Sequence, residues 1–145
     1  MTERSPDPSE IRSYTASDYE VLAQLLQEAG IFYEPFHSPA RVGAKIARDP
    51  ESILIAEREG EVIGTASIME DGSRAFIFGL AVAAEQQRQG VGSQLMAEAE
   101  SLLKSRGYEE VHILVDDGDD ELQAFYERHV YDPGHAYRWM TKGLG

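Results

Sequence analysis

The sequence predicts an α/β fold in which helices cover both faces of a mixed central sheet. Segments with the spacing of amphipathic helices alternate with short apolar segments typical of strands. The strands near the middle of the chain are joined by short turns, which indicates antiparallel pairing. The later strands are separated by a helix, which indicates crossover connections. The expected order of elements is β-α-α-β-β-β-α-β-α-β, with no internal repeat.

Length and composition favour one soluble domain. The chain has 145 residues, of which 42% are hydrophobic, enough for an ordinary core. We expect a flexible, charged tail over residues 1–10 and a single domain over residues 11–145. No apolar run is long enough for a membrane span, and the first residues lack the apolar region of a secretory signal. A cytoplasmic protein without a membrane partner is therefore expected.

Charge and residue usage exclude several kinds of site. The net charge of −13 disfavours nucleic acid as a partner. The absence of cysteine excludes disulfides, thiolate nucleophiles and Cys-ligated zinc. The four histidines lack the spacing of metal ligands, and the acidic residues 116–121 lack the spacing of a calcium loop, so no metal is expected.

The first third of the chain predicts one strand and two helices. Residues 11–15 suit a short strand, and residues 17–20 suit a capping box that begins a helix ending at Gly30. Residues 31–40 are aromatic and interrupted by proline, which indicates a loop. The Ser-Pro pair inside it suits the N-cap and first turn of a helix over residues 38–49. The apolar stripe of the first helix comprises Val21, Leu22, Leu25 and Leu26.

The middle of the chain predicts three strands. Two of them, over residues 52–58 and 61–69, are joined at Glu59–Gly60, which is a hairpin signal. The turn at Asp71–Gly72 leads to a third, strongly apolar strand over residues 74–82.

The last third predicts two helices and two strands. A helix over residues 90–106 ends at a glycine and is followed by a buried strand over residues 110–115. A helix over residues 121–130 and a closing strand over residues 135–142 complete the fold. Residues 135–140 offer an edge through which a homodimer could form. The stripe of the earlier helix comprises Val91, Leu95, Met96, Ala99, Leu102 and Leu103.

The turn Gln87–Gly92 has the sequence Q-R-Q-G-V-G and comes directly before a helix. Glycine is a poor helix former, so the two glycines here need either a structural reason or a bound anion. A helix N-terminus has unpaired amides and favours an anion, and glycine lets a phosphate approach the backbone. Arg88 would add a charge-assisted contact. The alternative is a tight strand-to-helix turn in which glycine permits close packing. Neither a Walker A loop nor a dinucleotide-binding fingerprint fits the spacing.

This turn resembles the Q/R-x-x-G-x-G/A signature of the GNAT N-acetyltransferase superfamily. As in that family, it follows an apolar strand and opens an amphipathic helix, and the similarity runs from Ile11 to Lys142. The stretch V-D-D-G-D-D-E-L-Q-A-F-Y-E-R-H-V-Y at 115–131 also resembles the family's closing block. The resemblance implies a GNAT-like, mostly antiparallel sheet with a splayed pair of strands.

The resemblance also implies acetyl-CoA as cosubstrate. Backbone amides of Gln87–Ser93 would then bind the diphosphate, and Leu80 and Val82 would bond the pantetheine arm. The amide near Leu80 would face the thioester oxygen and act as an oxyanion donor. The alternative is that these strand residues only form core. The cofactor-binding residues implied are Leu80, Ala81, Val82, Gln87, Arg88, Gln89, Gly90, Val91, Gly92, Ser93, Asp119 and Tyr126.

Tyr126 occupies the position at which the family often has a general acid that protonates the departing thiolate. Its spacing also suits a helix core, and that alternative stays open. The amine acceptor must lose a proton, but residues 75–82 contain no carboxylate. Glu34 is the first candidate for a base or an acceptor contact, because the aromatic segment around it suits an acceptor site. Glu70, Asp71 and His37 are further candidates, and each also suits an ordinary loop residue.

Two residues depart from the family's pattern. Asp119 stands where the family commonly has an Asn that contacts the cofactor, and it equally suits a helix N-cap. Val130 replaces a glycine, so the turn that ends the helix is expected to differ.

These observations together predict an N-acetyltransferase that moves acetyl from acetyl-CoA to a primary amine by direct attack in a ternary complex. The acceptor is a small molecule or a protein amine, and the acidic composition favours a cationic one. The alternative is a CoA-binding sensor or interaction module of the same fold with little or no turnover.

Overall fold

The computed structural model describes residues 9–145, which form two compact units that divide after Ile113. Each unit is described by itself, and the single domain over 11–145 stays a prediction. Most of the expected tail lies outside the described residues. Its last two residues are ordered, because Ser9 Oγ donates to Gln94 Oε1 at 2.5 Å and Glu10 begins the first strand.

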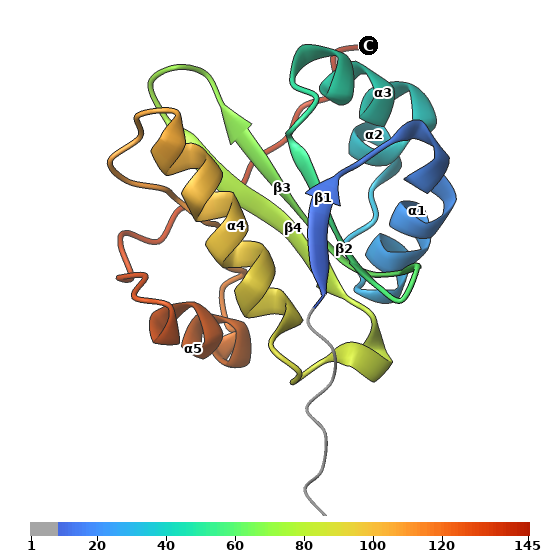
Figure 1. The fold of residues 1–145 in the computed structure, drawn as a ribbon. Helices are drawn as coiled ribbons and strands as arrows, with labels where there is room; N and C mark the ends of the chain where they lie inside the picture. The colour runs from blue at the N-terminus through green and yellow to red at the C-terminus, as the bar shows by residue number, and fades with distance from the viewer. Residues whose placement is uncertain (1–8) are drawn as a thin grey trace, which may run out of the picture. The chain divides into compact units, whose positions relative to one another are not determined.

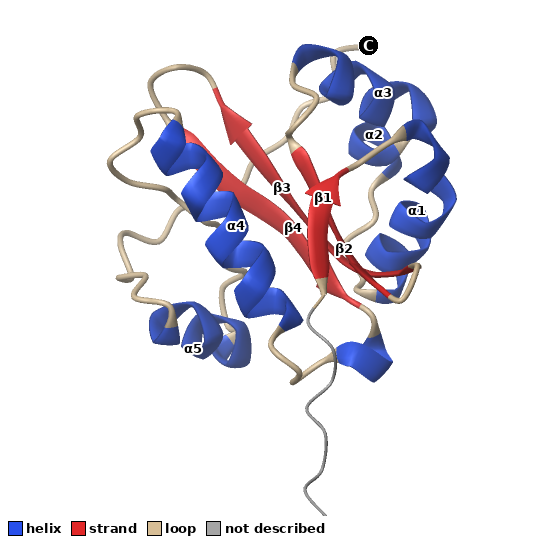
Figure 2. Ribbon diagram, viewed as in Figure 1, coloured by secondary structure: helices blue, strands red, loops and turns tan. Residues whose placement is uncertain are grey.

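The first unit is built on a four-stranded antiparallel sheet (Figures 1 and 2). The strands lie in the order β1-β2-β3-β4, so β4 is an edge strand. Both predicted hairpin turns are confirmed, and the turn between β2 and β3 places Glu59 and Gly60 at φ values of 54° and 80°. The strands span Glu10–Ser13 (β1), Ile53–Arg58 (β2), Glu61–Glu70 (β3) and Ala75–Val82 (β4).

Helices cover both faces of this sheet, as predicted (Figure 1). Helices α1 (Tyr19–Glu28) and α3 (Pro39–Arg48) lie on one face, and α4 (Val91–Ser105) lies on the other. The segment predicted as a loop over 31–40 contains the short helix α2 (Glu34–His37). A short 3₁₀ turn over Ala16–Asp18 precedes α1.

The cap before α1 differs from the prediction. The capping box is formed by Thr15 and Asp18 instead of residues 17–20. Asp18 accepts a hydrogen bond from the amide of Thr15 at 2.7 Å and forms a bidentate pair with Arg12. The salt bridge to Arg12 holds Asp18 in this position. Because Arg12 lies six residues earlier, in β1, the capping pattern alone does not reveal this contact. The predicted cap of α3 is confirmed, because Ser38 Oγ accepts from the amide of Arg41.

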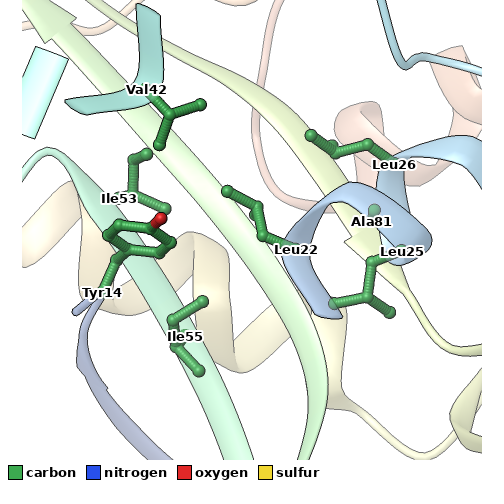
Figure 3. Close-up of a cluster of buried hydrophobic side chains, with 8 residues drawn as sticks. All are labelled: Tyr14, Leu22, Leu25, Leu26, Val42, Ile53, Ile55 and Ala81. Atoms are coloured by element: carbon green, nitrogen blue, oxygen red, sulfur yellow. The ribbon is translucent and has the colours of Figure 1, made fainter. Parts of the chain in front are cut away.

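Two hydrophobic layers hold the helices to the sheet. The first lies between the sheet and α1 and α3 (Figure 3), and the second lies under α4. In α4 the predicted stripe is buried except for Leu102, which is half-buried. The first layer comprises Tyr14, Leu22, Leu25, Leu26, Val42, Ile53, Ile55 and Ala81.

The last two predicted strands are wrong. The segment over 110–115 forms only a parallel bridge, in which His112 N donates to Ala75 O and Ile77 N donates to His112 O. The segment over 135–142 forms no strand, and its Tyr137 and Trp139 side chains are exposed. An apolar run becomes a strand only when a neighbouring strand accepts its hydrogen bonds. Homodimer formation stays a prediction, without the edge strand on which it was based.

The second unit contains one helix, α5, which spans Asp120–Arg128. Its predicted N-cap is confirmed, because the Asp119 carboxylate accepts from the amide of Leu122 at 3.1 Å. No helix within residues 9–145 is long and apolar enough to cross a membrane.

Candidate active site

Strand β4 contains a bulge at the position predicted for the oxyanion donor. In the pairing of β3 with β4, Thr65 lies opposite Ala81 and Ser67 lies opposite Phe78. Two residues of β4, Gly79 and Leu80, therefore face one residue of β3. Gly79 adopts a φ of 65°, a conformation that glycine accepts without strain. A bulge locally disrupts the ladder of hydrogen bonds and turns backbone groups away from it.

Among the described residues 9–145, no strand pairs with the outer edge of β4 along this bulge. Within the first unit, the backbone bonds on that edge are those of His112 with Ala75 and Ile77. From Phe78 to Val82 no strand continues the sheet there. A row of backbone donors and acceptors on an edge strand can bind an extended chain that carries amides of its own.

The glycine turn lies between β4 and α4, as predicted. After the 3₁₀ turn Ala84–Gln86, the chain passes through two left-handed residues, Arg88 at φ 67° and Gly90 at φ 85°. Gly90 is the N-cap of α4 and supplies no side-chain cap to the helix. A Cβ at Gly90 would have no atom within 4 Å, so the protein itself does not need glycine there for close packing. This glycine suits the left-handed conformation of the turn, and the space that a Cβ would occupy is empty.

Arg58, at the end of β2, holds the turn in place and was missed by the sequence analysis. Its Nη1 donates to Oε1 of Gln86 at 2.7 Å and to Oε1 of Gln89 at 2.9 Å. Gln87 is also tied down, because its Nε2 donates to Val82 O at 3.2 Å. The three glutamines of the segment thus fix a turn that contains two left-handed residues.

Tyr126 belongs to the second unit, where it lies on α5 beside Phe125 and Tyr131. Its ring packs edge-on to both of theirs, at centroid distances of 5.2 and 5.7 Å. Burial raises the pKa of the Tyr126 phenol, so the proton stays on the oxygen through the neutral range. The residue retains the protonation state that a proton donor needs, and its role at the thiolate stays a prediction.

Two of the four candidate bases, Glu70 and Asp71, lie next to each other at the end of β3 and the start of the β3–β4 turn. Glu70 accepts a hydrogen bond from the Tyr108 hydroxyl and lies 3.5 Å from Arg106 Nη1. Asp71 accepts from the amides of Ser73 and Arg74 and shapes the β3–β4 turn. These contacts favour a structural role for both carboxylates, with Glu70 as the last residue of β3 and Asp71 in the turn.

The other two candidates lie on α2. Glu34 is exposed at the first position of that helix. His37 Nδ1 accepts a hydrogen bond from the amide of Tyr33 at 3.0 Å, and burial lowers the pKa of its imidazole. Tyr33 and Phe36 stack edge-on at 4.7 Å and are partly exposed, so the helix presents aromatic surface next to Glu34.

Lys45, on α3, is a titratable residue whose amine lies against the sheet. It was not singled out from the sequence. Its Nζ donates to the carbonyl of Ile68 at 2.6 Å and lies 5.0 Å from the centre of the Phe78 ring. The sequence signal that could have identified Lys45 is its position between Val42 and Ile46, which form the inward-facing stripe of the helix.

The two departures from the family's pattern are Asp119 and Val130. Asp119 is used as the cap of α5, while its contact with the cofactor stays a prediction. Val130 adopts a φ of 69°, a conformation that favours glycine, and the expectation that its turn differs from the family's stays a prediction. The amides of Val130 and Tyr131 donate to Glu127 O and Tyr126 O, which holds the valine in that conformation.

Comparisons with known proteins identify the family. A model of the acetyltransferase (GNAT) family matches residues 19–130. An acetyltransferase of Pectobacterium atrosepticum is 27% identical over 124 residues, which cover 85% of this chain and 87% of that protein. An acetyltransferase of Photorhabdus laumondii is 28% identical over 126 residues, which cover 87% of this chain and 88% of that protein.

Solved structures agree with this result. Ard1 from Thermoplasma volcanium superposes with a TM-score of 0.75 at 26% identity, covering 84% of this chain and 81% of that one. The PaiA N-acetyltransferase of Thermoplasma acidophilum, solved in complex with coenzyme A, has the same fold, with a TM-score of 0.75 at 22% identity and coverage of 83% and 87%. Because the family match spans most of the sequence, the chain belongs to the acetyltransferase (GNAT) family and is an acetyl-CoA-dependent acetyltransferase.

Proposed function

We propose that the protein moves the acetyl group of acetyl-CoA to a primary amine by direct attack in a ternary complex. The observation that carries the proposal is the open, uncapped turn before α4, whose Gly90 has a φ of 85° and free space around the position of a Cβ. Members of the family use acetyl-CoA, and this turn has the properties that a diphosphate site requires.

The diphosphate would be held by backbone amides between Gln87 and Ser93. The first amides of a helix have no partner within that helix, and the helix dipole favours negative charge at this end. Arg88 is exposed on the same turn and adds a positive charge. The chain carries a net charge of −13, so a local positive site is needed to offset its repulsion of phosphate.

The pantetheine arm would run along the open edge of β4. Backbone groups of Leu80, in the bulge, and of Val82, two residues later, would bond the arm along this edge. The Leu80 amide would donate to the thioester oxygen and stabilise the negative charge that develops there during attack. Because these contacts come from the main chain, they are compatible with the side chain of Ala81 being part of the core.

Tyr126 would supply the proton that the departing thiolate needs. A phenol has a pKa of ~10 and a thiol one of ~8.5, so the transfer is uphill by about 2 kcal/mol in water. A donor held close to the sulfur compensates for this difference, because proton transfer then occurs within a preformed hydrogen bond.

The acceptor would reach the thioester from the aromatic segment that contains Glu34. Tyr33 and Phe36 offer apolar surface, and the Glu34 carboxylate can pair with a cationic group. Acceptors therefore include small amines and the amines of proteins, with a preference for positively charged molecules.

Calorimetry with acetyl-CoA, followed by an assay of free CoA thiol over a library of primary amines, tests the proposal. We expect saturable binding of acetyl-CoA and acceptor-dependent release of thiol. Binding without release for every amine would contradict the proposed transfer and support the alternative of a CoA-binding module.

A further inference from the structure

We propose that Lys45 is the catalytic base that removes the proton from the acceptor amine. The proposal rests on the proposed function and assigns a residue to the step for which β4 provides no carboxylate.

The inference depends on the position of the Lys45 amine, which reaches from α3 to the sheet. Its Nζ lies over the ring of Phe78, the residue immediately before the bulge at Gly79 and Leu80. A strand rises by about 3.3 Å per residue, so Leu80 follows Phe78 by roughly 7 Å along β4. The amine of Lys45 thus contacts the side chain that stands two residues before the backbone amide proposed to bind the thioester oxygen.

The same face of the sheet is open beyond Phe78. Alternation along β4 places Phe76 on the face of Phe78, and Met69 lies opposite Phe76 on β3. Met69 is 54% exposed, and it lines a shallow groove together with Phe76, Glu70, Asp71 and Arg74. An acceptor whose amine lies beside Lys45 would have this strip as further binding surface.

The surroundings of Lys45 suit a group that must shed its proton near neutral pH. Burial lowers the pKa of Lys45 to about 8, and the carboxylate of Asp49, the residue after α3, opposes this shift. From β3 the amine faces the carbonyl of Ile68, and from β4 it faces the ring of Phe78, neither of which titrates. In its neutral form, the Lys45 amine donates one hydrogen bond to Ile68 O and keeps a nitrogen lone pair that can accept a proton.

The proton balance of the step is complete. A protonated acceptor first gives one proton to neutral Lys45. Its neutral nitrogen then forms a bond to the acetyl carbon and loses a second proton to water. The carbon–sulfur bond breaks, and the thiolate takes a proton from Tyr126. Lys45 then releases its proton to water, and Tyr126 recovers one from water.

Two substitutions separate this role from a structural one. Lys45→Arg keeps the charge but removes the neutral form, because guanidinium does not titrate in this range. Lys45→Met keeps the length of the apolar stem. Lys104→Met is the matched control, because Lys104 is an exposed lysine in the last turn of α4.

The assay measures CoA release with two acceptors across pH 6–10. One is the best alkylamine from the library, which is protonated at neutral pH, and the other is hydroxylamine, which is already neutral at pH 7. For Lys45→Arg and Lys45→Met we expect at least a tenfold loss of kcat with the alkylamine, an unchanged KM for acetyl-CoA, and a rate with hydroxylamine within twofold of the wild type. The rise in alkylamine rate near pH 8 should disappear in both variants, while Lys104→Met behaves as the wild type.

Failure of the Lys45 role and failure of the proposed transferase function give different results. Equal losses with both acceptors, or a Lys45→Arg variant that keeps the wild-type rate and pH profile, would overturn the role of Lys45 while leaving the transferase intact. If wild-type protein binds acetyl-CoA but transfers acetyl to no amine, the proposed function fails and the base role fails with it.

Discussion

The guanidinium of Arg58 donates to the side-chain oxygen of Gln86 at 2.7 Å, which ties the β2–β3 hairpin to the turn that opens α4. A second bond from the same nitrogen reaches Gln89 at 2.9 Å. The turn includes Arg88 and Gly90, both in the left-handed region of φ. Its conformation is therefore held by contacts from a distant hairpin as well as by its own sequence.

Arg58→Met should weaken the binding of acetyl-CoA while leaving the chemical step unchanged. A hydrogen bond to a charged donor contributes about 1.5–3 kcal/mol, and partial exposure reduces this, so we expect a loss of about tenfold in affinity. Calorimetry and a kcat against KM comparison measure the effect. Arg41→Met, at an exposed arginine of α3, is the control. Wild-type affinity in the Arg58 variant would show that the turn needs no such support.

Gly90→Ala should reduce acetyl-CoA binding by more than it reduces stability. Alanine in the left-handed region costs about 1 kcal/mol of folding free energy, and its Cβ would project into the space proposed for the diphosphate. Gly107→Ala is a matched control, because Gly107 follows the other end of α4 with a φ of 94° and equally open surroundings. Both variants should lose similar stability in urea unfolding, and only Gly90→Ala should lose affinity. Equal affinities would argue against a ligand at this turn.

Tyr126→Phe should lower kcat at least tenfold and leave the KM for acetyl-CoA nearly unchanged. The substitution removes one hydroxyl from a buried ring and keeps its packing against Phe125 and Tyr131. Tyr137→Phe, at a tyrosine that is 85% exposed, is the control. An unchanged turnover would remove Tyr126 from the mechanism.

Val130→Gly should stabilise the protein by about 1 kcal/mol. Val130 has a φ of 69° and is 86% exposed, so glycine would relieve backbone strain with little loss of buried surface. The greater freedom of glycine in the unfolded chain offsets part of the gain. Thermal and urea unfolding measure the change, and a lower midpoint than wild type would show that the valine conformation is not strained.

Asp18→Asn should cost stability at neutral pH but not at low pH. Arg12 lowers the pKa of Asp18 from 3.8 to about 2, because it pairs with the charged form. The stabilisation is present above the unfolded pKa and is lost as the pH falls from about 4 to about 2, with a maximum of about 2 kcal/mol. Urea unfolding at pH 7, 4 and 2.5 should show the variant converging with the wild type. Asp117→Asn, at an exposed loop position, should behave as the wild type throughout.

Local signals in the sequence predicted most of the first unit. The Glu59–Gly60 and Asp71–Gly72 turns, the stripe of α4 and the glycine turn each depend on residues close together in the chain. The predicted strands over 110–115 and 135–142 failed because pairing depends on a partner elsewhere. Arg58 and Lys45 were missed for the same reason: their contacts lie 28, 31 and 23 residues away.

We propose that main-chain amides between Gln87 and Ser93 bind the diphosphate of acetyl-CoA. A crystal structure of the protein with bound coenzyme A tests it most directly. We predict diphosphate oxygens within hydrogen-bonding distance of several of these amides, with the pantetheine arm beside Leu80 and Val82. A coenzyme bound elsewhere, with this turn filled by side chains of the protein, would contradict the account.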